Sequence, residues 1–132
     1  MSKFIQVKQA IARQYNKNLR NIKGVQLPGN FGNVINSYWL YTINLPVELT
    51  SYRDNILGSM LKDGIEARPI FFPMSEMPPY KQYIDKDKGY SVSSYLSKSG
   101  ISLPSSVDLT KEDISRISNS FIKAINKVKI DN

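Results

Sequence analysis

Apolar side chains recur at spacings of three and four residues along the first part of the chain, over residues 4–22. This spacing is typical of one face of an amphipathic helix. Glycine often ends helices, and Gly24 follows the last apolar position. We therefore predict a helix over residues 3–22 that buries one row of side chains, namely Phe4, Val7, Ile11, Tyr15, Leu19 and Ile22.

Three segments have the pattern of substantial β-strands. The strongest is 38–45, which is dense in aromatic and β-branched residues. The others are 25–28 and 65–68, and Pro69 predicts that the last strand lies at an edge of a sheet or turns there. A briefer extended piece is predicted at 101–104.

Two further helices are predicted in the middle of the chain. Thr50 or Ser51 can cap the first of them, and Gly64 ends it as a left-handed residue. Its expected core face consists of Ile56, Leu57, Met60 and Leu61. The second is a short helix around residues 92–96, which closes at Gly100.

The last helix has the clearest start signal. Thr110 can serve as its N-cap and Asp113 occupies the third helical position, where the two side chains form a capping box. Its predicted buried stripe is Ile114, Ile117, Phe121, Ile125 and Val128. The whole pattern predicts a single α+β domain over residues 1–132, in which helices cover a small, mainly antiparallel three-stranded sheet.

The composition removes several kinds of chemistry. The 132 residues include no cysteine and no histidine, so thiol nucleophiles, disulfides, Cys/His zinc sites and imidazole proton shuttles are excluded. We predict no metal site and no catalytic residue. The net charge of +7 permits an anionic partner, but the basic residues are scattered over the helices and do not favour nucleic acid. Because no apolar run has the length of a signal peptide or membrane span, we expect a cytoplasmic protein without a membrane partner.

The segment 70–80 is the most unusual part of the chain, because three prolines alternate with large apolar groups. One interpretation is that it presents Ser75 and Glu76 to a ligand, with Arg68 offering a planar guanidinium to phosphate or carboxylate. The other is that Arg68 pairs with Glu66 or Glu76 and that the loop only packs its aromatic groups. Residue types alone favour the second interpretation.

The strand at 38–45 carries three large aromatic groups near its start. Strand alternation would place Trp39 and Tyr41 on one face and Tyr38 on the other. The core can cover one face, whereas an aromatic group on the opposite face needs cover from another domain or subunit. We therefore predict that Tyr38, Trp39 and Tyr41 contribute to an interface.

Several short segments, in their order and spacing, resemble the C-terminal domain of the DegT/DnrJ/EryC1/StrS aminotransferase family. They are residues 11–16, 27–28, 38–41, 53, 61–69, 72–74, 78–80, 100–105 and 109–114. The resemblance covers about residues 5–128, and the run 68–76 looks closest to the perosamine-synthase-like branch.

The resemblance implies the small domain of a fold-type I aminotransferase. Such enzymes use pyridoxal phosphate to move an amino group from glutamate to a nucleotide-linked keto sugar, in surface-polysaccharide or deoxysugar biosynthesis. It also implies that the cofactor lysine and most phosphate contacts belong to a larger N-terminal domain. This chain alone is therefore expected to bind no cofactor and to lack transaminase activity.

The resemblance also assigns roles to residues and partners. The segment 68–80 matches the part of the family that reaches toward the substrate, so its candidate substrate-binding residues are Arg68, Phe72, Ser75, Glu76 and Tyr80. Many relatives carry histidine where this chain has Ser75, which is a departure from the family pattern. The implied partners are a large pyridoxal-phosphate-binding domain or a second subunit, and a nucleotide sugar in the complete enzyme. The alternative is a stand-alone binding module for an anionic ligand or a partner protein.

Overall fold

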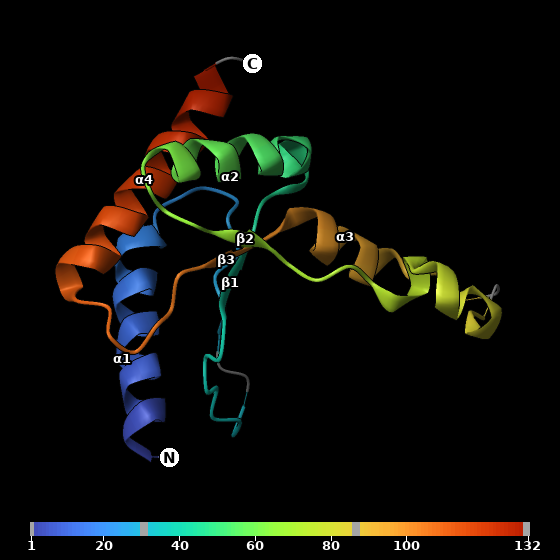
Figure 1. The fold of residues 1–132 in the computed structure, drawn as a ribbon, viewed down its shortest axis with the longest axis horizontal. Helices are drawn as coiled ribbons and strands as arrows, with labels where there is room; N and C mark the ends of the chain where they lie inside the picture. The colour runs from blue at the N-terminus through green and yellow to red at the C-terminus, as the bar shows by residue number, and fades with distance from the viewer. Residues whose placement is uncertain (1, 30–31, 86–87, 131–132) are drawn as a thin grey trace.

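A three-stranded antiparallel sheet lies at the centre of the fold (Figure 1). The computed structural model describes residues 2–29, 32–85 and 88–130. The strands are β1 (Tyr41–Asn44), β2 (Arg68–Pro69) and β3 (Gly100–Leu103). The α-helices are α1 (Ser2–Leu19), α2 (Arg53–Lys62), α3 (Ser91–Ser99) and α4 (Lys111–Ile130), and the 3-10 helices are η1 (Val47–Tyr52), η2 (Met74–Glu76) and η3 (Pro78–Tyr83).

The strand order is β1-β3-β2, with both pairs antiparallel. This confirms the predicted α+β class with a small antiparallel sheet. The segment 101–104 was expected only as a brief extended piece, whereas β3 is a full strand and lies between the other two. All four residues of β3 are buried, including the polar Ser102.

The predicted strand at 25–28 shrinks to a single antiparallel bridge between Gln26 and Asn44. The predicted edge position of Pro69 is confirmed, since β2 pairs with β3 on one side only and ends at this residue. Proline lacks the N–H that a longer ladder would need, which accounts for a strand of two residues.

Helix α4 packs against both α1 and α2, and the three helices lie together on one side of the molecule (Figure 1). The predicted buried stripe of α4 is confirmed. In α1, the core prediction holds for Ile11, Tyr15 and Leu19, whereas Phe4 and Val7 are exposed. In α2, Leu61 is likewise exposed rather than in the core. A periodic stripe therefore extends beyond the part of each helix that has a packing partner.

The capping box of α4 is confirmed. The Asp113 N–H donates to Thr110 Oγ1 at 3.1 Å, and the Thr110 N–H donates to Asp113 Oδ2 at 3.0 Å. Gly64 ends α2 with φ +74°, as predicted. Capping of α2 by Thr50 or Ser51 is wrong, because η1 precedes α2 and Thr50 Oγ1 donates to the Val47 carbonyl instead.

The segment between β2 and β3 leaves the body of the molecule. Figure 1 shows α3 and the chain before it projecting to the side opposite α1 and α4. The proline-rich stretch forms η2 and η3 instead of an α-helix or a regular strand, as its composition indicates. None of the helices in the described ranges has the length and apolar character that crossing a bilayer requires.

Candidate functional site: an exposed aromatic arm

The segment 70–83, called the arm below, is fixed to the sheet at its base. The Ile70 N–H donates to the Gly100 carbonyl at 3.2 Å, and the Ile70 side chain covers Gly100. A Cβ at Gly100 would lie 2.7 Å from Ile70 Cγ2, so only glycine allows this close approach. Farther along, the Glu76 carboxylate accepts a hydrogen bond from Ser94 Oγ, which joins η2 to α3.

Hydrogen bonds also hold helix α3 to the body. Tyr95 Oη donates to the Leu45 carbonyl at 2.8 Å, just beyond β1. Arg53 Nη1, at the start of α2, donates to the Ser97 carbonyl at 2.6 Å. The arm therefore contacts a helix that is hydrogen-bonded to the body, although the arm itself projects away from the core.

Large apolar side chains of the arm face outward. Phe72 is 73% exposed and Tyr83 is 76% exposed. The full set of exposed large groups in the arm is Phe71, Phe72, Met74, Tyr80 and Tyr83. Single exposed apolar residues are common on protein surfaces, but a run of them marks a surface that another protein segment or a ligand can cover.

Arg68, at the foot of the arm, pairs with Glu66. Its Nη2 and Nε lie 2.9 Å and 3.2 Å from Glu66 Oε1. The predicted pairing of Arg68 with Glu66 is confirmed, whereas the accompanying prediction that the loop only packs its aromatic groups is wrong, because these groups are exposed. Both side chains are exposed, and such surface pairs contribute little, about 0–1 kcal/mol, so the guanidinium can exchange this partner for a ligand.

Ser75 and Glu76 differ in how they are placed. The Ser75 hydroxyl is buried and has no hydrogen-bond partner within the described residues. Glu76 is exposed, but its carboxylate is engaged by Ser94. Of the five residues predicted to bind substrate, all except Ser75 are exposed; a role in substrate binding stays a prediction for all five.

The predicted alternation at the start of β1 is wrong. The Tyr38 N–H donates to Asn36 Oδ1 at 2.8 Å, and Tyr38 adopts φ +49°, which breaks the extended backbone before β1. As a result Tyr38 and Tyr41 are both buried, whereas Trp39 is 70% exposed. An interface role for these aromatic residues stays a prediction, and Trp39 is the one of the three with an accessible ring.

Tyr41 serves the core of this domain. Its ring stacks on Tyr15 with the centroids 4.6 Å apart, and its hydroxyl donates to Asn16 Oδ1 at 2.6 Å. The Tyr15 hydroxyl donates to the Pro104 carbonyl at 2.7 Å. Burial raises the pKa of both phenols, so both remain neutral donors.

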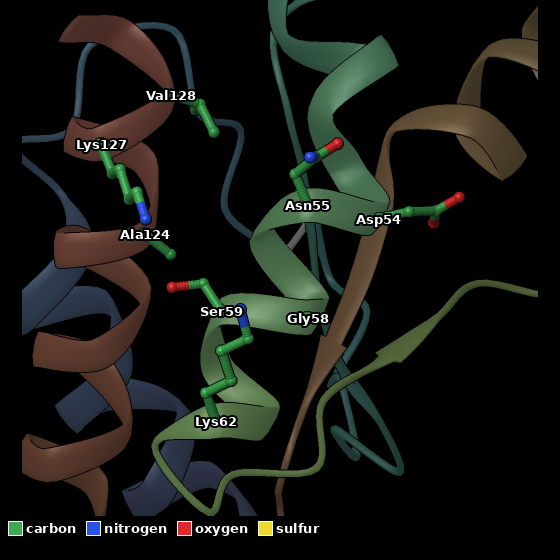
Figure 2. Close-up of a pocket in the computed structure, with 8 residues that line it drawn as sticks. All are labelled: Asp54, Asn55, Gly58, Ser59, Lys62, Ala124, Lys127 and Val128. Carbon is green, nitrogen blue, oxygen red and sulfur yellow. The ribbon is translucent and has the colours of Figure 1, made fainter. Parts of the chain in front are cut away.

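A groove between α2 and α4 was not found by sequence reasoning (Figure 2). It combines residues of α2 with residues of α4 that lie more than sixty positions later, including Ser59 and Lys127. The sequence contains no local signal for such a combination, because it depends on how the two helices pack. Within the described part of the chain, no group of three or more acidic side chains is placed to hold a metal ion.

The same fold occurs in solved structures of aminotransferases. PseC of Helicobacter pylori, an aminotransferase of pseudoaminic acid biosynthesis, has the same fold over 93% of this chain and 33% of its own, with a TM-score of 0.82 at 22% identity. The family model of the DegT/DnrJ/EryC1/StrS aminotransferases matches residues 1–122. This chain belongs to that family.

The curated relatives agree with this assignment. The GDP-perosamine synthase of Vibrio cholerae is 30% identical over 119 residues, which cover 90% of this chain and 32% of the relative. EpsN of Bacillus subtilis, described as a pyridoxal phosphate-dependent aminotransferase, is 27% identical over 129 residues, or 96% of this chain and 32% of the relative. The chain thus spans about a third of the length of these relatives.

The family uses pyridoxal phosphate, and the environment of Lys8 does not suit a lysine that holds this cofactor. A lysine that holds it needs a free amine in a lined pocket. Burial lowers the pKa of Lys8, yet its Nζ is engaged by the Trp39 carbonyl at 3.2 Å and by both oxygens of Ser105. The amine of Lys8 thus joins two loops, and we derive no step of the reaction through the cofactor on this chain.

Proposed function

We propose that this chain is the C-terminal small domain of a nucleotide-sugar aminotransferase and works together with a larger pyridoxal-phosphate-binding domain. The observation that carries the proposal is the exposed arm in a chain that matches its family over residues 1–122 but spans only about a third of its relatives. A domain corresponding to the other two thirds of a relative's length would supply the surface that covers Phe72 and its neighbours.

The substrate class is proposed from the relatives. Several of them are described as GDP-perosamine synthases, and PseC is described as acting in pseudoaminic acid biosynthesis. A nucleotide-linked keto sugar carries both phosphate and ring surfaces. Arg68 would pair with phosphate, while Phe72 and Tyr80 would cover the sugar and exclude water.

In the complete enzyme, the bound cofactor supplies the electron sink for amino transfer. The residues of this chain would bind and orient the sugar and exclude water. The isolated chain is then expected to be inactive with glutamate and a keto sugar.

The test is reconstitution. We expect the purified chain to form a stable complex with a large-domain chain of the same family, and amino transfer to require both chains together with pyridoxal phosphate. The chain alone should show no cofactor absorbance. If borohydride fixed the cofactor onto a lysine of this chain, and the chain alone converted an amino donor, the proposal would be overturned.

A further inference from the structure

The groove between α2 and α4 has a volume of about 500 Å³, within the range of small-molecule sites. Figure 2 shows that α2 forms one wall and α4 forms the other. The residues of the two walls that matter for the argument are Asn55, Gly58, Ser59 and Lys62 from α2, and Ala124 and Lys127 from α4.

Gly58 leaves the α2 wall open. Glycine is a poor residue for the interior of a helix, and α2 carries it in the middle. A Cβ at this position would meet no atom within 4 Å, so packing within the chain does not require glycine there. The missing side chain keeps space free beside Ser59.

Two ammonium groups point into this space from opposite walls. Figure 2 shows Lys62 of α2 and Lys127 of α4 both turned toward Ser59. Within the described ranges, no salt bridge joins either lysine to a carboxylate, whereas Lys123, one turn before Lys127, pairs with Asp63 at 3.5 Å.

The acidic residue in the lining does not neutralise these charges. Asp54 Oδ1 lies 2.9 Å from Arg53 Nη2, and Figure 2 shows the carboxylate turned away from the two lysines. The groove therefore presents two cations and the polar side chains of Ser59 and Asn55 without a competing internal anion. This combination matches a phosphate group, which carries up to two negative charges and several acceptor oxygens.

We propose that the groove between α2 and α4 binds a phosphorylated small molecule. Its phosphate lies between Lys62 and Lys127 and accepts a hydrogen bond from Ser59 Oγ. The rest of the molecule lies along Ala124 and the aliphatic stems of the lysines, because a phosphate alone would fill only part of the groove. The site uses no residue of the arm and is independent of the proposed function.

The test is a titration of the isotopically labelled chain with glucose 6-phosphate, followed by NMR at constant ionic strength. We expect saturable shifts of the amide signals at residues 55–62 and 124–128, and none of similar size with glucose. Lys62→Gln and Lys127→Gln should each weaken binding about three- to tenfold, the loss expected for one charged contact at an accessible site.

Lys3→Gln is the matched control, because Lys3 is exposed in the first turn of α1 and does not line the groove. It should leave the affinity unchanged. The same spectra report whether each variant is folded. The proposal is overturned if no saturable shifts appear at the groove, if glucose produces the same shifts, or if Lys3→Gln weakens binding as much as the groove variants do.

Discussion

Short-range hydrogen bonds from backbone N–H groups to side chains decide where two of the elements begin. Thr110 and Asp113 exchange such bonds at the start of α4, and Asn36 accepts the N–H of Tyr38 ahead of β1. The first was predictable, because a capping box is a fixed pattern of residue types at fixed spacing. The second was not, since asparagine two positions before an aromatic residue has no single structural meaning, and the positive φ of Tyr38 then turned Trp39 outward.

At this scale we predict a pH dependence that rests on Asp113. The hydrogen bonds from the Thr110 hydroxyl and N–H hold the pKa of this carboxyl below its ordinary value. The unfolded chain therefore takes up a proton at a higher pH than the folded one. Stability from this group is fully present above the unfolded pKa, near ~3.9, and is lost as pH falls through the folded value.

Asp113→Asn should then show a weaker loss of stability between neutral pH and pH 3 than the natural chain, as measured by urea unfolding. Part of the dependence should remain, because a hydrogen bond from Ser120 also lowers the pKa of Asp63. Glu112→Gln, in the same helical turn, is the matched control and should retain the Asp113 contribution. Identical pH profiles for Asp113→Asn and the natural chain would contradict the assignment.

At the scale of elements, two glycines occupy opposite environments. Close packing of neighbouring atoms requires glycine at one position, whereas at the other glycine only weakens a helix. Gly100 begins β3 with an ordinary extended backbone, so its conformation does not require glycine, but Ile70 Cγ2 and the Leu96 carbonyl oxygen crowd it. Gly58 lies inside α2 with open space around it. The sequence places both glycines in or beside helices and does not distinguish these situations.

We predict that alanine has opposite effects at these two positions. Gly100→Ala should destabilise the fold by about 1–3 kcal/mol, because the new methyl would lie 2.8 Å from the Leu96 carbonyl oxygen, which cannot move without disturbing the end of α3. Gly58→Ala should stabilise it by about 0.5–1 kcal/mol through higher helix propensity. Thermal and urea unfolding of both variants measure the difference, and an equal effect of the same sign would refute the contact at Gly100.

At the scale of the whole molecule, the domain has two unlike sides. The helices α1, α2 and α4 share the core with the sheet, while the arm and α3 project away from it (Figure 1). The aromatic groups of the arm add little to the core of this chain. Their exposure makes sense if they contact a partner, as proposed for the large domain.

We therefore predict that Phe72→Ser weakens the complex with a large-domain chain by about tenfold or more, as expected for an aromatic anchor at an interface. The melting temperature of the isolated chain should change little, because the ring is already exposed. Calorimetric titration measures the affinity. Ile130→Ser, at the exposed end of α4, is the control and should bind as the natural chain does. If Phe72→Ser and Ile130→Ser bind the large-domain chain with equal affinity, the arm is not part of the interface.

The sequence alone determined the features that local physical rules specify. The helix α4 with its capping box and buried stripe, the end of α2 at Gly64, the edge position of Pro69 and the family resemblance all follow from patterns of neighbouring residues. Helical periodicity, capping and the missing N–H of proline act over a few residues, so they can be recognised without knowledge of the rest of the chain.

Only the tertiary structure decided which of these elements meet. It placed β3 at the centre of the sheet, left Phe4 and Leu61 exposed at the ends of amphipathic stripes, buried Tyr38 and Tyr41, and brought Lys62 and Lys127 to one groove. Burial depends on the partner across the interface between elements, and that partner is distant in the sequence. The sequence near each residue therefore contains no signal for such contacts.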